Sequence, residues 1–66
     1  MNTTAVLTYR IKSSKELVTW YYDFSDNAAR VDYEATVDGL RAIKDDEGNY
    51  IQESLVDYMV TSFEMN

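Results

Sequence analysis

The residue types that carry most enzyme and metal chemistry are missing from this chain, which has no cysteine and no histidine among its 66 residues. Nucleophilic catalysis by Cys or His is therefore excluded, and a Ser or Thr nucleophile would need a lysine or a carboxylate as its base. Disulfides and zinc sites built from Cys or His are excluded for the same reason. The side chains left to do chemistry are twelve carboxylates.

Paired carboxylates can act as acid and base in glycoside hydrolysis, but they need a cleft that fits a sugar and raises one pKa. A chain of this length buries only about 60% of the surface that its unfolded form exposes, which leaves little room for such a cleft. We therefore expect a protein that is not an enzyme and that carries no cofactor.

The acidic run Asp45, Asp46 and Glu47 before Gly48 raises the question of a calcium loop. An EF-hand places an acid at loop position one, glycine at position six and Glu at position twelve. With Gly48 at position six, Ile43 and Ser54 take the two outer positions, so the pattern does not match. Weak divalent binding stays open as an alternative, but a solvated polar turn is the favoured interpretation, and no metal is expected.

Charge is distributed unevenly along the chain, whose net charge is −6. Residues 1–22 carry a net charge of +2, whereas residues 23–66 carry eleven acids against three bases, for a net charge of −8. Direct nucleic-acid binding is not expected, because phosphate contacts require Lys and Arg. The charge predicts either a basic protein partner or simply solubility.

The first half of the chain predicts a hairpin. Residues 4–12 alternate between apolar and polar side chains, as in a half-buried strand. Ser13 and Ser14 predict a turn or, through the capping-box spacing to Glu16, a helix start. Residues 16–24 fit a strand or a short helix, and their β-branched and aromatic side chains favour the strand.

The second half predicts two strands and a helix. After turn chemistry at residues 25–27, residues 31–37 alternate cleanly and predict a strand, and Asp38-Gly39 predicts a tight turn into a strand over 40–43. Residues 45–49 predict a second turn. From residue 52 onward the apolar side chains fall at helical spacing, at Leu55, Val56, Met59, Val60 and Phe63.

Together these elements predict one α+β domain over residues 1–66, a small antiparallel sheet of three to four strands with one C-terminal amphipathic helix. Nine aromatic residues are expected to supply much of its core. No segment has the pattern of a signal peptide or the length of an apolar membrane span, so the cytoplasm is the expected location, or the host cytoplasm for a phage-encoded chain.

The predicted strand over 31–37 would place Asp32, Glu34 and Asp38 on one side, successive acids being about 6.6 Å or more apart given the strand rise. DNA carries one charge per about 3.4 Å along each strand, so a second row of acids would be needed to match it. Candidates for that row, at the neighbouring turns and on the predicted helix, are Asp23, Asp26, Asp45, Asp46, Glu47, Glu53 and Asp57. Such a surface would imitate the field of DNA, and the alternative is an ordinary solvated acidic face.

In its length, negative charge, aromatic content and lack of cysteine, the chain resembles small phage-encoded inhibitors that imitate DNA, among them anti-CRISPR proteins and uracil-DNA glycosylase inhibitors. The glycosylase inhibitors insert a Glu-Ser-Ile triplet into the DNA cleft of the enzyme, and this chain has Glu53-Ser54-Leu55 after Gln52. The resemblance implies that Glu53 substitutes for a phosphate. It covers three residues and places them in a predicted C-terminal helix, whereas the triplet of the family lies on an early edge of the fold.

Two hypotheses follow from the sequence. In the first, the chain is a phage or mobile-element inhibitor whose carboxylates occupy the nucleic-acid-binding surface of a basic host protein. In the second, it is a homodimeric structural or regulatory module that pairs an edge strand or buries Tyr and Met on a shared helix face.

Overall fold

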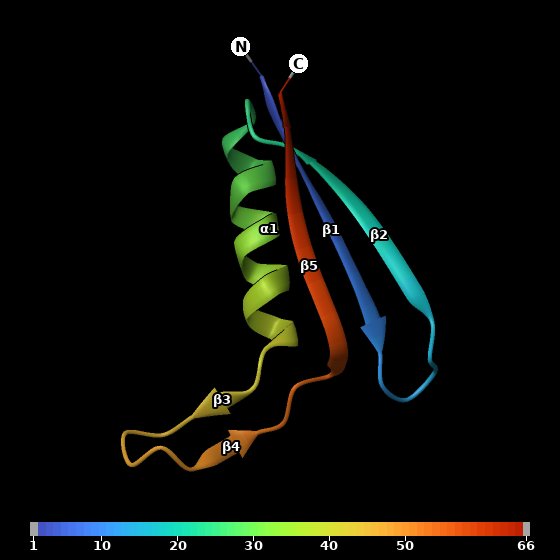
Figure 1. The fold of residues 1–66 in the computed structure, drawn as a ribbon. Coiled ribbons are helices and arrows are strands. Elements are labelled where there is room, and N and C mark those ends of the chain that lie inside the picture. The colour runs from blue at the N-terminus through green and yellow to red at the C-terminus, as the bar shows by residue number, and fades with distance from the viewer. Residues whose placement is uncertain (1, 66) are drawn as a thin grey trace.

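The computed structural model describes residues 2–65, which form three long strands, one helix and a short hairpin (Figure 1). The elements follow one another as β1 (Thr3–Ile11), β2 (Leu17–Asp23), α1 (Asn27–Leu40), β3 (Ile43–Lys44), β4 (Tyr50–Gln52) and β5 (Val56–Met65). The α+β composition predicted from the sequence is present. The predicted arrangement is wrong, because the helix lies in the middle of the chain and the last element of the chain is a strand.

The main sheet has the strand order β2-β1-β5, and both pairs are antiparallel. In the central rows of the sheet, Leu7 of β1 stands opposite Trp20 of β2 and Thr61 of β5. The predicted first strand, the strand interpretation of residues 16–24 and the hairpin between them are confirmed. A turn joins the two strands in place of a helix start, and Lys15 takes a left-handed conformation there with φ 62.

Helix α1 replaces the strand predicted over residues 31–37, and Asp38 and Gly39 lie in its last turn and not in a tight turn. Asp26 caps its N-terminus, where the side-chain oxygen accepts a hydrogen bond from the Ala28 amide. The alternation in the sequence conceals a second pattern, a stripe of apolar side chains about one turn apart at Ala29, Tyr33, Val37 and Leu40. This stripe faces the sheet, so helical burial prevails over the period-two pattern.

Strand β5 replaces the helix predicted from residue 52 onward. Its apolar residues mimic a helical stripe because they lie on both faces of the strand: Met59 and Phe63 share the face of α1, whereas Val60 lies on the other face. β-branched and aromatic side chains are frequent in this segment, which is a strand preference. The helical spacing of the apolar residues thus arises because β5 carries apolar side chains on the side of the sheet that faces α1 and also on the opposite side.

The hairpin of β3 and β4 projects from the end of the molecule below α1 (Figure 1). The acidic turn predicted over residues 45–49 is confirmed. The strand predicted over 40–43 is wrong except at Ile43, which begins β3, because Leu40 is the last residue of α1. The Asp45 carboxylate accepts hydrogen bonds from the amides of Glu47 and Asn49. Gly48 supplies the positive φ, 86°, that closes the turn.

The core lies between α1 and the sheet and is thin. Leu7, Tyr9, Val37 and Val56 form its buried centre. Around it, the Tyr33 hydroxyl shares a hydrogen bond of 2.9 Å with the Thr61 hydroxyl. The radius of gyration is 13.6 Å, larger than the roughly 10.8 Å expected for a compact chain of this length. The molecule is therefore flat and extended, with extents of 41 × 29 × 15 Å.

Candidate functional site

The three acids predicted to form one strand row lie instead on helix α1, where they separate. At about 100° per residue, Glu34 and Asp38 lie on one side of the helix and Asp32 lies about 200° away from Glu34. All three side chains are exposed. Asp32 lines a hollow of about 430 Å³ with Trp20 and Tyr22 of β2. The continuous carboxylate row inferred from the sequence is thus absent, and Glu34 and Asp38 form a pair one turn apart.

The remaining predicted acids of the second half gather on and near the projecting hairpin. Asp45 is held by the turn, whereas Asp46 and Glu47 are exposed at its tip. Glu53 follows β4 directly and is exposed beside Lys12 and Tyr50. Glu53 lies in a connection before β5 and not in a helix, so the structure leaves the triplet outside the element in which the sequence placed it.

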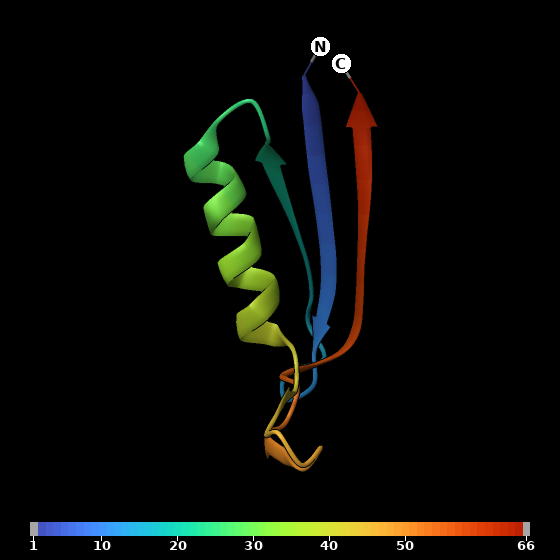
Figure 2. The ribbon, with the colours of Figure 1, turned by 90° about the vertical axis from the view of Figure 1, so that its left-hand side faces the viewer.

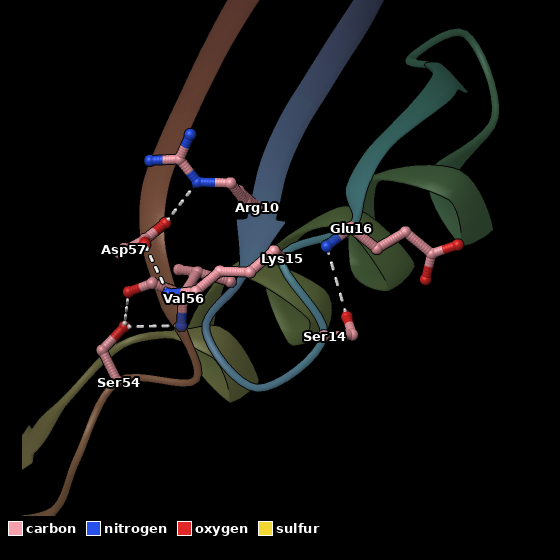
Figure 3. A network of polar contacts seen from close by, with 7 residues as sticks. All are labelled: Arg10, Ser14, Lys15, Glu16, Ser54, Val56 and Asp57. Carbon is pink, nitrogen blue, oxygen red and sulfur yellow. Dashed lines mark hydrogen bonds and ion pairs between the residues drawn. The ribbon is translucent and has the colours of Figure 1, made fainter.

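Asp57 differs from the other predicted acids because it is neutralised within the molecule. Its carboxylate accepts a hydrogen bond of 2.8 Å from Nε of Arg10, and the Lys15 ammonium lies 3.9 Å from its second oxygen (Figure 3). The Arg10 hydrogen bond holds the pKa of Asp57 below its ordinary value. Asp57 is therefore a structural partner of β1 and contributes little to any free acidic surface.

We call residues 26–53, which contain α1 and the hairpin, the acidic segment. It carries eight acids against three bases, a net charge of −5, so the rest of the chain has a net charge of −1. Within residues 2–65, no carboxylate of this segment has a cation within ion-pair distance. Two of its bases contact rings, with Arg30 5.2 Å from Phe24 and Lys44 4.7 Å from Tyr50. The carboxylates are thus left to act on the surroundings.

The side of the sheet that faces away from α1 was not singled out from the sequence. Figure 2 shows that the helix covers one side of the three strands and that no described element covers the other. We call this second side the open face. The registers place on it Thr4, Val6, Thr8 and Arg10 of β1, Leu17, Thr19, Tyr21 and Asp23 of β2, and Tyr58, Val60, Ser62 and Glu64 of β5.

A signal for the open face was present in the sequence. Once Val18, Trp20 and Tyr22 are assigned to the buried side of β2, the alternate positions include Leu17 and Tyr21, which are large and apolar in body. A solvated strand face is normally polar at such positions. The exposed fractions are 62% for Leu17 and 68% for Tyr21, so both side chains are largely exposed to solvent.

The hollow of about 430 Å³ beside Asp32 is lined by side chains that hydrogen-bond to one another. In the hollow beside Asp32, the Trp20 indole donates a hydrogen bond of 3.2 Å to the Tyr9 hydroxyl, and the Tyr22 hydroxyl donates one of 3.3 Å to Thr36. The first bond joins β2 to β1 within the sheet, and the second joins β2 to α1. No group of three or more metal-ligating side chains is found within residues 2–65.

No helix of the described chain is long and apolar enough to cross a membrane. Comparison of the chain with protein-family models, with curated proteins and with solved structures finds no match.

Proposed function

We propose that this chain is a non-enzymatic binding protein whose acidic segment docks on a basic surface of a nucleic-acid-binding protein and so excludes nucleic acid from it. The observation that carries the proposal is the concentration of a −5 net charge in residues 26–53 without an internal ion pair. Carboxylates that are not neutralised within a protein produce a field that attracts lysine and arginine on a partner.

The geometry supports docking by the helix and the hairpin together and not by a strand face. Glu34 and Asp38 stand one turn apart on α1, about 6 Å between their Cβ atoms by helix geometry. Asp46, Glu47 and Glu53 lie on or beside the hairpin at the C-terminal end of α1 (Figure 1). A basic groove that normally holds a phosphate backbone would meet carboxylates from both elements.

The experiment uses two variants that change the net charge by the same amount. Glu34→Gln with Asp38→Asn and Glu16→Gln with Glu64→Gln each raise the net charge from −6 to −4. The first pair lies in the acidic segment and the second lies outside it. Each protein is immobilised, and basic DNA-binding proteins from a bacterial lysate are captured, identified by mass spectrometry and purified for titration.

We expect binding of the captured protein to weaken roughly tenfold or more for the acidic-segment variant, since each lost contact to Lys or Arg contributes on the order of 1 kcal/mol. The control variant should bind within about twofold of the parent chain. Double-stranded DNA should compete for the same surface, and raising the salt concentration should weaken the complex steeply. Equal affinities of the two variants, or a complex indifferent to salt and DNA, would refute the proposal.

A further inference from the structure

The open face is a large exposed surface on which apolar and aromatic side chains stand among polar ones. Its side chains include Leu17, Tyr21, Tyr58 and Val60, whose exposed fractions lie between 46% and 68%. The helix covers the opposite side of the same strands (Figure 2). Exposed aromatic and apolar side chains gathered on one uncovered face of a small protein are typical of a protein interface. The flat shape of the chain agrees, because a further layer would convert it into a compact body.

The two ends of the open face carry opposite charges. At one end, Thr4 of β1 pairs with Asp23 on one side and with Glu64 on the other, so this row carries two carboxylates. At the other end stand Arg10 and, against Asp57, the ammonium of Lys15 (Figure 3). Two bases and one acid leave this end with a net charge of +1.

The rows between the two ends are uncharged. Val6 lies between Tyr21 and Ser62, and Thr8 lies between Thr19 and Val60. Rows without charge can be covered by a second protein without burying an unpaired ion. Charge therefore affects docking only at the two ends.

We infer that the open face binds a second copy of this chain, the two sheets packing face to face about a two-fold axis with their strands antiparallel. This orientation places the acidic end of each copy, with Glu64, on the basic end of the other, with Lys15 and Arg10. A two-fold axis parallel to the strands would instead bring like ends together. The surface is thus complementary to itself in one orientation, which a two-fold interface requires.

The size of the face agrees with a weak dimer. Three strands about 4.8 Å apart and seven residues of about 3.3 Å each give a footprint of roughly 14 Å by 23 Å. Because side chains stand above this plane, two copies would bury on the order of 1,000 Å² in total, the lower limit for a specific interface. We expect a dissociation constant in the micromolar range. This inference is independent of the proposed function, which rests on the acidic segment.

The first experiment measures the oligomeric state by sedimentation equilibrium from about 1 to 500 μM. Val60→Lys places a charge in the uncharged centre of the open face, and Val31→Lys is the matched control on the exposed side of α1. The parent chain and the control should dimerise alike, and Val60→Lys should weaken the dimer at least tenfold. Thermal melting at low concentration verifies that both variants are folded.

The second experiment tests the orientation by charge reversal at the two ends of the face. In the antiparallel dimer, Glu64→Lys brings like charges together at both ends, and Lys15→Glu does the same with the opposite sign. Each variant alone should therefore dimerise more weakly than the parent chain. An equimolar mixture of the two should recover the dimer, because each new charge then meets its complement on the other copy.

Three results would overturn the inference. The first is a folded parent chain that stays monomeric at 500 μM, which would assign the open face to a different protein. The second is a dimer that Val60→Lys leaves intact, which would assign association to an exposed strand edge, where main-chain pairing does not depend on this side chain. The third is a charge-reversed mixture that associates no better than its components, which would exclude the antiparallel orientation.

Discussion

The acidic segment and the open face differ in the physical means by which each can hold a partner. The acidic segment is a helix and a projecting hairpin with a net charge of −5, whose attraction acts over a Debye length and weakens with salt. The open face is a nearly neutral, rigid surface of three paired strands with exposed Leu and Tyr side chains, whose attraction acts only on contact. The separation of these surfaces would let one chain bind the two proposed partners by mechanisms that respond to different conditions.

The largest effect is expected for the side chains that join the two regions. Leu7 is fully buried between the sheet and α1, and the core around it is small. Leu7→Ala should lower the free energy of unfolding by about 3 kcal/mol, because it removes buried methyl groups and leaves a cavity. Urea unfolding at 1 μM, followed by the fluorescence of the lone tryptophan Trp20, measures this change.

Tyr21→Ala on the open face is the contrasting variant. Tyr21 is 68% exposed in the single chain, so its removal should change the free energy of unfolding by less than about 0.5 kcal/mol at a concentration where the chain is monomeric. At high concentration the same change should destabilise the protein, because the parent chain is then stabilised by association. A Tyr21→Ala cost as large as that of Leu7→Ala at 1 μM would show that the two faces do not differ as described.

A second, smaller effect concerns the polar link between α1 and β5. The hydroxyls of Tyr33 and Thr61 are 2.9 Å apart and share a hydrogen bond at the edge of the core. Tyr33→Phe should cost about 1 kcal/mol of stability while keeping the ring contacts with Tyr22 and Phe24. Chemical denaturation measures the loss, and an unchanged stability would mean that ring packing alone fastens the helix to the sheet.

The sequence predicted the first hairpin and the acidic turn correctly because local pattern and burial agree there. β1 has one buried and one exposed face, so its alternation is clean. α1 was misassigned because Val31 and Ala35 complete an alternating pattern although both are exposed. The helical stripe through Tyr33 and Val37 could be distinguished from this alternating pattern only by knowing which positions the sheet covers. That sheet is formed by segments distant in the sequence.

The candidate site was predictable in composition but not in arrangement. The concentration of acids in the second half of the chain is a property of the sequence, and it remains as the acidic segment. Which acids share a face depends on the element that carries them, so the change from strand to helix separates Asp32 from Glu34. The sequence alone could not exclude Asp57 from the predicted acidic surface. Its partner Arg10 is 47 residues away and is brought beside it by the pairing of β1 with β5.

The Asp57 pair offers a test through pH, because it lies at the charged end of the open face. Arg10 lowers the pKa of Asp57 in the folded chain, so the ionised carboxylate stabilises the fold above the ordinary range of aspartate. This contribution is lost as the pH falls below about 4 and the carboxylate becomes protonated. Asp57→Asn should therefore be less stable than the parent chain at neutral pH, with the difference shrinking as the pH falls.

Thermal melting of both proteins from pH 7 to pH 2 measures this difference. Glu16→Gln is the control, since no ion pair involves Glu16 within the described residues. A difference between Asp57→Asn and the parent that stays constant over this range would mean that the carboxylate acts through packing and not through its charge.

The smallest effect on stability is expected at the C-terminal end of α1. It distinguishes the destabilisation that an acid causes at the helix end from the general repulsion caused by the net charge of the acidic segment. The last turn of α1 carries Asp38 and no basic residue, although the negative pole of the helix dipole lies there. Glu34, one turn earlier, adds a like charge. Asp38→Asn should therefore raise the free energy of unfolding by about 0.5 kcal/mol while it weakens binding to a basic partner. Asp46→Asn at the hairpin tip removes the same charge away from the helix end, so it should leave stability unchanged.

Chemical denaturation of both variants at low salt measures the two changes in the free energy of unfolding. A gain for Asp38→Asn alone means that Asp38 destabilises the helix, as expected for a residue that is retained for recognition. Equal gains would attribute the effect to general repulsion within the segment and would remove this support for a role of Asp38 in binding.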